Sequence, residues 1–351
     1  MSTIIRARSP YYIRKADLAN FTGATISVYI YEGVSPTDLP ASPQYTLTKE
    51  PINSELAVTF EISELIRDYF DNVYDGNYTS SAGSVLHVRV ITQQSVSTGS
   101  APSPITDDYL AFDAYSEFHD GVNFGFATNL VPFDSTILYE ATNRLYVPVL
   151  AEETSQVQFK YNGAIVQTNT ITDNGNTNQK IQYPVYIGNV DQVLITPASA
   201  LPITYEVEEI EECKYPTYKI TFVNKYGVLE DVWFHKKSVE SMNTTKQQFN
   251  RNLLNRTTLT YSTKAHSKNV YNKTANQSIL LNSGFYPEAY NSTFEQLLLS
   301  EFVWMTKTGS SDIHPMVISD SSFTYKTSVN DKLINYTMNF DYAYDLINNV
   351  H

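Results

Sequence analysis

Residues that could carry out catalysis are few in this sequence, and they are scattered along it. The six histidines are His87, His119, His235, His266, His314 and His351. No two of them stand at a spacing typical of metal ligands. His119 and Asp120 come nearest to a reactive pair, but they precede Gly121 in an apparent turn, where an Asp side chain commonly bonds its own backbone. We therefore expect a structural role for this dipeptide.

Motifs that bind cofactors or activate nucleophiles are also missing from the sequence. It has no phosphate-binding loop, no nucleophile elbow, no zinc-protease helix and no glycine-rich dinucleotide turn. Asp107 and Asp108 could bind calcium from a loop, but no EF-hand spacing surrounds them. Carboxylates are too plentiful to nominate two for glycoside hydrolysis. We expect no enzyme, no catalytic residue, no cofactor and no metal site, with an undetected hydrolase as the alternative.

Composition favours a mainly β protein. Hydrophobic residues make up 42% of the 351 residues and charged residues 17%, which is typical of a folded chain. Aromatic residues reach 13%, with 27 Tyr and 17 Phe, and they join Val, Ile and Thr in the apolar runs. These types suit pleated, half-buried surfaces. The single cysteine, Cys213, excludes an intrachain disulfide and a cysteine-based zinc site.

The sequence suggests a product made in a cytoplasm and not inserted in a membrane. Residues 1–15 contain no apolar stretch long enough for a signal peptide. No window approaches eighteen consecutive apolar residues, the length that indicates a membrane-spanning helix.

Charge is distributed unevenly along the chain. The net charge is −13, with 10 Lys/Arg against 26 Asp/Glu in residues 1–212 and 14 against 11 in residues 213–351. Five glutamates crowd into residues 206–212 at this boundary. They indicate either a solvated strand edge or a charged seam that meets a basic partner.

We expect three segments: two serial β-sandwich-like modules and a C-terminal α+β module. The first, residues 1–118, carries one short helix after Ser63 as N-cap, and His87 should face solvent from a strand. The second, residues 119–212, has the short, evenly spaced strands of a small immunoglobulin-like domain, with a hairpin turn at Asn162-Gly163. The third is residues 213–351.

The third segment should contain a hairpin over residues 218–234 and a helix within residues 284–305. Ser292 and Glu295 have the spacing of a capping box for this helix. Its apolar face would then consist of Phe294, Leu298, Phe302 and Met305.

Residues 236–273, between the hairpin and the helix, form a basic tract. Eight Lys/Arg and one acidic residue occur there, interleaved with Phe249 and Tyr261. This pattern could describe a nucleic-acid surface, but the whole chain is acidic, with a pI near 4.9. We therefore favour a solvated face or a face that meets an acidic neighbour.

The chain finishes on a strand pattern of unusual length. Apolar and aromatic residues occupy every even position from Ile334 to Tyr344, so one face should be buried. We expect a terminal hairpin from Phe323 to Tyr344, too long for a small domain to cover, whose apolar face packs on other polypeptides. The expected assembly interface is Phe323, Tyr325, Ile334, Tyr336, Met338, Phe340, Tyr342 and Tyr344.

Three stretches of the third segment carry a resemblance when taken together. They are ITFVNKYGVLEDVWFHKKS, GFYPEAYNSTFEQLLLSEFVWM and TYKTSVNDKLINYTMNFDYAYDLINN. As a set they resemble structural proteins of tailed bacteriophages, especially phages of Bacteroidetes hosts. The resemblance is strongest over residues 213–349 and looser over the opening residues 9–33.

This resemblance implies a virion protein but supplies no functional residue. We expect a tail, baseplate or connector component that assembles with copies of itself and with other virion proteins, without membrane or nucleic acid. The alternatives are a receptor- or glycan-binding fibre module and an auxiliary capsid (head-decoration) protein.

Overall fold

Strands dominate the structure, a computed structural model that describes residues 3–16, 19–33, 39–52, 57–78, 84–124, 136–140, 144–198, 201–320, 322, 324 and 333–347. Strand accounts for 50% and helix for 7% of the residues that the structure describes, so the prediction of a mainly β protein is confirmed. In the described part, no helix has the length and apolar character needed to cross a membrane.

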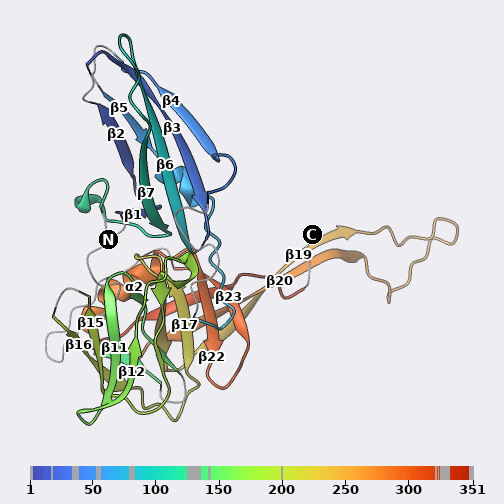
Figure 1. Cartoon of the computed structure of the whole chain (residues 1–351). Helices are drawn as coiled ribbons and strands as arrows, with labels where there is room; N and C mark the ends of the chain where they lie inside the picture. Colours follow the sequence, from blue (N-terminus) through green and yellow to red (C-terminus); the bar gives the residue numbers. More distant parts are fainter. Residues whose placement is uncertain are drawn as a thin grey trace.

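The first large sheet stands at one end of the molecule (Figure 1). In spatial order its strands are β1 (Thr3–Arg6), β7 (Ile105–Phe112), β6 (Val85–Val96), β3 (Phe21–Tyr31) and β4 (Tyr45–Lys49). A separate pair, β2 (Tyr12–Ala16) and β5 (Ala57–Glu61), and helix α1 (Ser63–Arg67) accompany it. Alternate residues Ala24, Ile26, Val28 and Ile30 of β3 are buried, so the period of two places one face in a core.

The second large sheet is built from the middle of the chain. Its strands are β12 (Ala164–Thr170), β11 (Thr154–Tyr161), β15 (Gln192–Pro197), β16 (Ile203–Glu209) and β8 (Thr136–Tyr139). Beside it lie two small ladders, β9 (Leu145–Tyr146) with β14 (Val185–Tyr186) and β10 (Val149–Leu150) with β13 (Ile181–Gln182), and the 3₁₀ turn η2 (Thr177–Gln179). Asn162 and Gly163 both have positive φ (49° and 76°) between β11 and β12, which confirms the predicted hairpin.

The third sheet has seven strands and ends in a long ribbon. Its order is β18 (Leu229–Phe234), β17 (Tyr218–Val223), β22 (Val303–Lys307), β23 (Ile313–Ile318), β25 (Thr337–Tyr342), β20 (Lys268–Asn282) and β19 (Val239–Asn250). The ladder β21 (Tyr286–Pro287) with β24 (Leu333–Ile334), the turn η3 (Glu288–Tyr290) and helix α2 (Asn291–Leu298) complete it. Strands β17 and β18 form the hairpin predicted over residues 218–234. Phe294 and Leu297 of α2 are fully buried in the same core as residues of the sheet.

Two helix predictions are wrong in detail. Ser63 is the first helical residue of α1 and not its N-cap, since its hydroxyl bonds Glu61 instead of the helix end. Helix α2 has Tyr290 as N-cap without a side-chain cap, so the capping box of Ser292 and Glu295 does not form. The helix ends at Leu298, and Met305 lies on β22, because the chain turns into a strand that pairs with β17.

His87 also departs from its prediction. It faces inward from β6, is only 3% exposed and lies against the Tyr31 ring, with a centroid separation of 5.5 Å. Burial lowers the pKa of His87, so the neutral ring is favoured. Alternation along β6 does not distinguish its two faces here, because both Leu86 and His87 are buried.

Each large sheet comes from one continuous part of the chain, within the predicted segments 1–118, 119–212 and 213–351, but the cores extend across them. One buried cluster joins Phe112 of the first segment to Leu150 and Ile181 of the second and Val228 of the third. Backbone bonds join them as well: the Tyr115 N–H donates to the Lys225 carbonyl over 3.0 Å. The division into separate domains and the sandwich description of each segment stay predictions.

Candidate functional site

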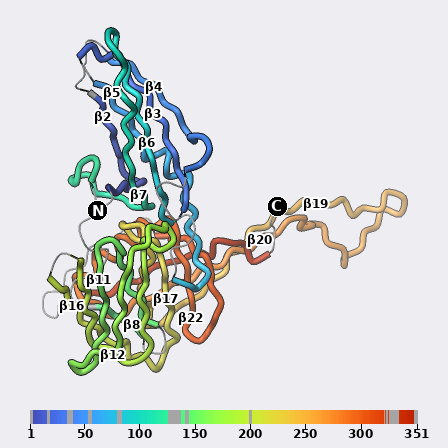
Figure 2. Tube along the Cα trace, in the orientation of Figure 1, coloured from blue at the N-terminus to red at the C-terminus, as the bar shows by residue number. Residues whose placement is uncertain are grey.

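An exposed hairpin leaves the third sheet, and we call its residues 242–277 the arm. Strands β19 and β20 pair with each other along its length. Strand β25 pairs with β20 only over Ser278–Asn282, so β19 and β20 lack any further strand neighbour in the described chain beyond that point. Figures 1 and 2 show the ribbon projecting from the body.

The arm is long and presents apolar side chains to solvent. All twelve residues of β19 are exposed. From Met242 to Asn250, at about 3.4 Å a residue, the strand extends about 30 Å, and the loop of residues 251–267 lies beyond it. The exposed large apolar residues of the arm are Met242, Phe249, Leu254, Leu259, Tyr261, Val270 and Tyr271. Exposed apolar surface of this kind is typical of interaction sites.

The arm is also uniformly basic. It contains six Lys/Arg and no Asp or Glu, whereas the remaining residues carry 18 Lys/Arg against 37 Asp/Glu. The six are Lys246, Arg251, Arg256, Lys264, Lys268 and Lys273. None of them makes an ion pair with a carboxylate of the described chain. The nearby Lys236 differs, because its Nζ lies 2.7 Å from Glu212 at the root of the ribbon.

Local geometry fixes how the arm displays these groups. Lys246 lies directly opposite Lys273 in the ladder, so two like charges share one face. A register shift after Gln247 follows, and the rings of Phe249 and Tyr271 meet at 6.1 Å between centroids. Bulges of this kind re-aim side chains and increase the twist of a ribbon.

The tip of the arm has its own turn. Asn255 and Thr260 form an isolated bridge, and the Leu259 N–H donates to the Asn255 carbonyl over 2.9 Å. Leu259 has φ of +53°, and its side chain is 75% exposed. Positive φ is uncommon for a Leu, and strained backbone of this kind clusters at functional sites.

The face predicted for assembly lies elsewhere and is covered by the chain itself. Ile334, Tyr336, Met338 and Phe340 are at most 5% exposed. Tyr342 is half-buried, and Tyr344 is 43% exposed. Phe323 and Tyr325 lie outside the described residues.

That prediction is therefore wrong for the four buried residues, and the reason is visible in the packing. Strand β25 runs between β23 and β20, which pair with its two edges, and the residues expected to open the hairpin lie mostly outside the described part of the chain. Phe294 of α2 meets the Tyr336 ring at 4.7 Å, and Phe234 of β18 meets Phe340 at 5.6 Å. The chain also leaves strand geometry between β24 and β25, so the eleven-residue strand is two short ones.

The dipeptides considered for chemistry form structural contacts. Asp120 accepts a hydrogen bond from the Glu117 backbone N–H over 2.9 Å, as expected for a turn aspartate, while His119 is exposed. Asp107 and Asp108 lie on β7 and not in a loop. Asp107 pairs with Lys15 of β2, in the separate ladder, and Asp108 pairs with Arg89 of the adjacent strand β6. Within the described residues, no cluster of His, Cys, Asp or Glu could hold a metal ion.

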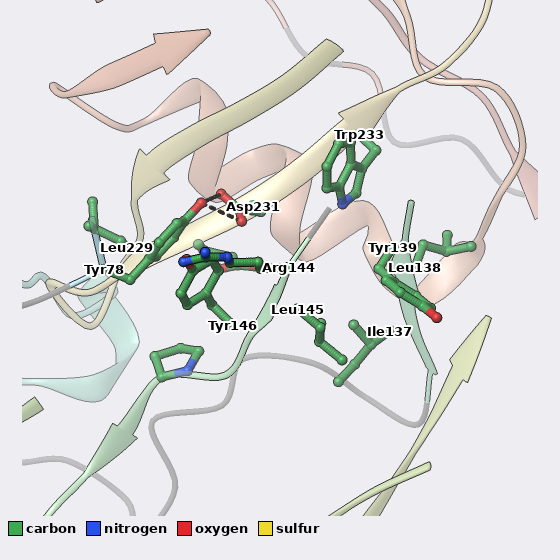
Figure 3. A pocket seen from close by; sticks show the side chains of 12 residues that line it. Tyr78, Ile137, Leu138, Tyr139, Arg144, Leu145, Tyr146, Leu229, Asp231 and Trp233 are labelled. Carbon is green, nitrogen blue, oxygen red and sulfur yellow. Dashed lines mark hydrogen bonds between the residues drawn. The ribbon is translucent and has the colours of Figure 1, made fainter. Parts of the chain in front are cut away.

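A buried polar cluster that the sequence did not reveal joins the three segments (Figure 3). The Tyr78 hydroxyl accepts from Lys219 Nζ (2.6 Å) and donates to Asp231 (2.6 Å to Oδ1). The Tyr78 ring stacks on Tyr146 of the second segment at 3.8 Å. Thr221 adds a hydrogen bond to Asp231 over 2.6 Å.

Electrostatics in this cluster favour a fixed structural network. Burial, reinforced by the charge of Asp231, raises the pKa of Tyr78 well above its ordinary value. Burial acts to lower the pKa of Lys219, but Asp231 and Tyr74 outweigh it and raise that pKa. The adjoining cavity holds about 20 Å³, which is room for about one water molecule and not for a substrate.

Comparisons with known proteins add no family to this description. No protein-family model matches the sequence, and no curated protein matches it.

Proposed function

We propose that the chain is a non-enzymatic structural component of a bacteriophage particle, in the tail, baseplate or connector, and that its arm makes the assembly contacts. The observation that carries the proposal is the arm itself, a ribbon of residues 242–277 with exposed apolar and basic side chains. The described chain covers it only at its base, where Ala275 is buried and its carbonyl accepts a hydrogen bond from the Leu346 N–H. The resemblance of residues 213–349 to virion proteins supports the same role.

The composition of the arm is that of an interface. Aromatic residues and Arg are enriched where proteins meet, and they carry much of the binding energy. A two-stranded ribbon is only marginally stable alone in water. A partner that covers Phe249, Tyr261 and Tyr271 would supply the burial that the ribbon lacks by itself.

We assign to the arm the assembly role that we predicted for the terminal strands. The argument that a long exposed ribbon needs another polypeptide still applies, but to β19 and β20 instead of β24 and β25. The terminal strands instead complete the core from which the arm extends.

A direct test is the protein content of purified particles. Particles from cells that make the chain are banded on a density gradient, and the chain is quantified against the major capsid protein by mass spectrometry. We expect a fixed copy number per particle that survives a high-salt wash. Absence from intact particles would contradict the proposal, and selective binding of the purified chain on a glycan array would favour a receptor-binding module instead.

A further inference from the structure

We propose that the arm of one copy binds the acidic surface of residues 1–212 of a second copy of this chain. The inference rests on the proposed assembly role and deepens it by naming the partner.

Charge complementarity within one sequence is the first argument. The arm has six basic residues and no acidic one, while residues 1–212 hold 26 Asp/Glu against 10 Lys/Arg. Opposite potentials steer association and fix which surfaces meet. The negative charge of the rest of the chain also disfavours a nucleic acid as the partner of the arm. A polyanion bound to the arm would lie beside a strongly negative protein.

The paired lysines give the second argument. Lys246 and Lys273 are directly opposed and exposed, and neither has a carboxylate partner in the described chain. Like charges directly across a ladder destabilise it in isolation. A carboxylate from another molecule, placed between the two ammonium groups, turns that repulsion into attraction.

Apolar anchors are the third argument. The Phe249–Tyr271 ring contact and the exposed Leu259 side chain stand along the same ribbon as the basic groups. An interface with apolar anchors inside a charged rim is typical of specific protein association. Two arms of equal positive charge repel each other, so arm-to-body contact is favoured over arm-to-arm contact.

This contact joins two different surfaces of the chain. Unlike a self-complementary dimer face, a contact between different surfaces can be repeated from copy to copy, and it closes into a ring when the rotation allows. A ring is the arrangement expected of a connector or baseplate layer.

The first experiment compares the full chain with an arm-shortened variant by sedimentation velocity. Thr245 lies opposite Thr274, so residues 246–273 can be replaced by Asn-Gly, which closes a two-residue hairpin between them. We expect the full chain to self-associate with an affinity that falls roughly tenfold or more between 50 and 500 mM NaCl. The shortened variant should be monomeric and should keep the melting temperature of the full chain.

The second experiment locates the contact. A photo-crosslinking phenylalanine analogue replaces Phe249, and equal amounts of ¹⁴N and ¹⁵N protein are mixed before illumination. We expect mixed-isotope peptides that join the arm to residues 1–212. Oligonucleotides added as competitors should leave these crosslinks unchanged.

Three results would overturn the inference: a monomeric full chain at all concentrations, crosslinks only between two arms, or displacement of the crosslinks by oligonucleotides. A monomeric chain that is nevertheless a fixed part of purified particles would refute the second copy as partner and leave the structural role standing. If the chain self-associates but is absent from particles, the second copy stands as the partner and the structural role in the particle is refuted.

Discussion

Tyr78 and Asp231 form a hydrogen bond of 2.6 Å although 153 residues separate them in the sequence. The bond ties the loop after α1 to β18 of the third sheet. Because Tyr78 also stacks on Tyr146, one side chain contacts all three segments. The arm therefore projects from three segments that are held together by direct side-chain contacts. Such a rigid base suits the assembly role proposed for the arm.

Removing the Tyr78 hydroxyl tests how much these contacts contribute to stability. We expect Tyr78→Phe to lower the free energy of unfolding by about 1–3 kcal/mol, because the partly buried Lys219 and Asp231 each lose a partner. Urea denaturation measures the change. Tyr261→Phe, at an exposed ring on the arm, is the matched control and should have almost no effect; equal losses in the two variants would rule out a special role for the cluster.

Glu230 should make stability depend on pH. Burial raises the pKa of this carboxyl to about 8, against 4.5 for an ordinary Glu, although a hydrogen bond from Asn224 acts in the opposite direction. Between pH 4.5 and pH 8, the Glu230 carboxyl is therefore protonated in the folded protein and ionised in the unfolded chain. This contribution to stability is complete below about pH 4.5 and is lost as the pH rises towards 8, by up to about 1.4 kcal/mol per pH unit.

Glu230→Gln provides the check on this pH dependence. The neutral amide should remove this part of the pH dependence. The stability of the variant relative to the unaltered protein should therefore be higher at pH 8 than at pH 5. Unfolding free energies of both proteins at these two pH values measure it. Parallel stability curves for the two proteins between pH 5 and 8 would show that Glu230 does not hold the proton.

Phe340 tests the core that covers the terminal strands. We expect Phe340→Asp to cost several kcal/mol, because it places an unpaired charge in a site that is 0% exposed, between β18 and α2. Thr337→Asp, on the outward face of the same strand, is the control and should change the melting temperature little. A near-normal melting temperature for Phe340→Asp would mean that the strand faces the other way.

Lys246→Glu separates assembly from stability. The new carboxylate faces Lys273 directly, so it should stabilise the hairpin by about 0.2–1 kcal/mol while it removes a positive charge from the binding face. We expect self-association to weaken at least tenfold with an unchanged or higher melting temperature. Association equal to that of the unaltered chain would show that this lysine does not meet an acidic surface.

How far the sequence predicts this structure depends on the kind of pattern involved. The alternation at Ile334, Tyr336, Met338 and Phe340 predicts the buried face correctly, because burial on one side leaves a period of two. The same pattern cannot say which residues provide the cover. The cover comes from α2 and β18, distant in sequence, and not from another polypeptide.

The strands of the arm are not predicted by the sequence, for the opposite reason. All residues of β19 are exposed, so no hydrophobic period marks it as a strand, and its Asn, Thr and Gln residues read as a loop. The charge pattern does mark this region, and from it we predicted that residues 236–273 form a solvated face or a face that meets an acidic neighbour. The Tyr78 cluster left no signal, because its members come from three segments that only the fold brings together.

The proposed role is tested most directly by competition inside particles. Cells supply equal amounts of the full chain and of the Asn-Gly variant that lacks residues 246–273, and purified particles are analysed by mass spectrometry for arm-specific and shared peptides. If the arm makes the assembly contacts, the shortened chain should be depleted at least tenfold in the particles relative to the lysate. Equal incorporation of the two chains would contradict the account.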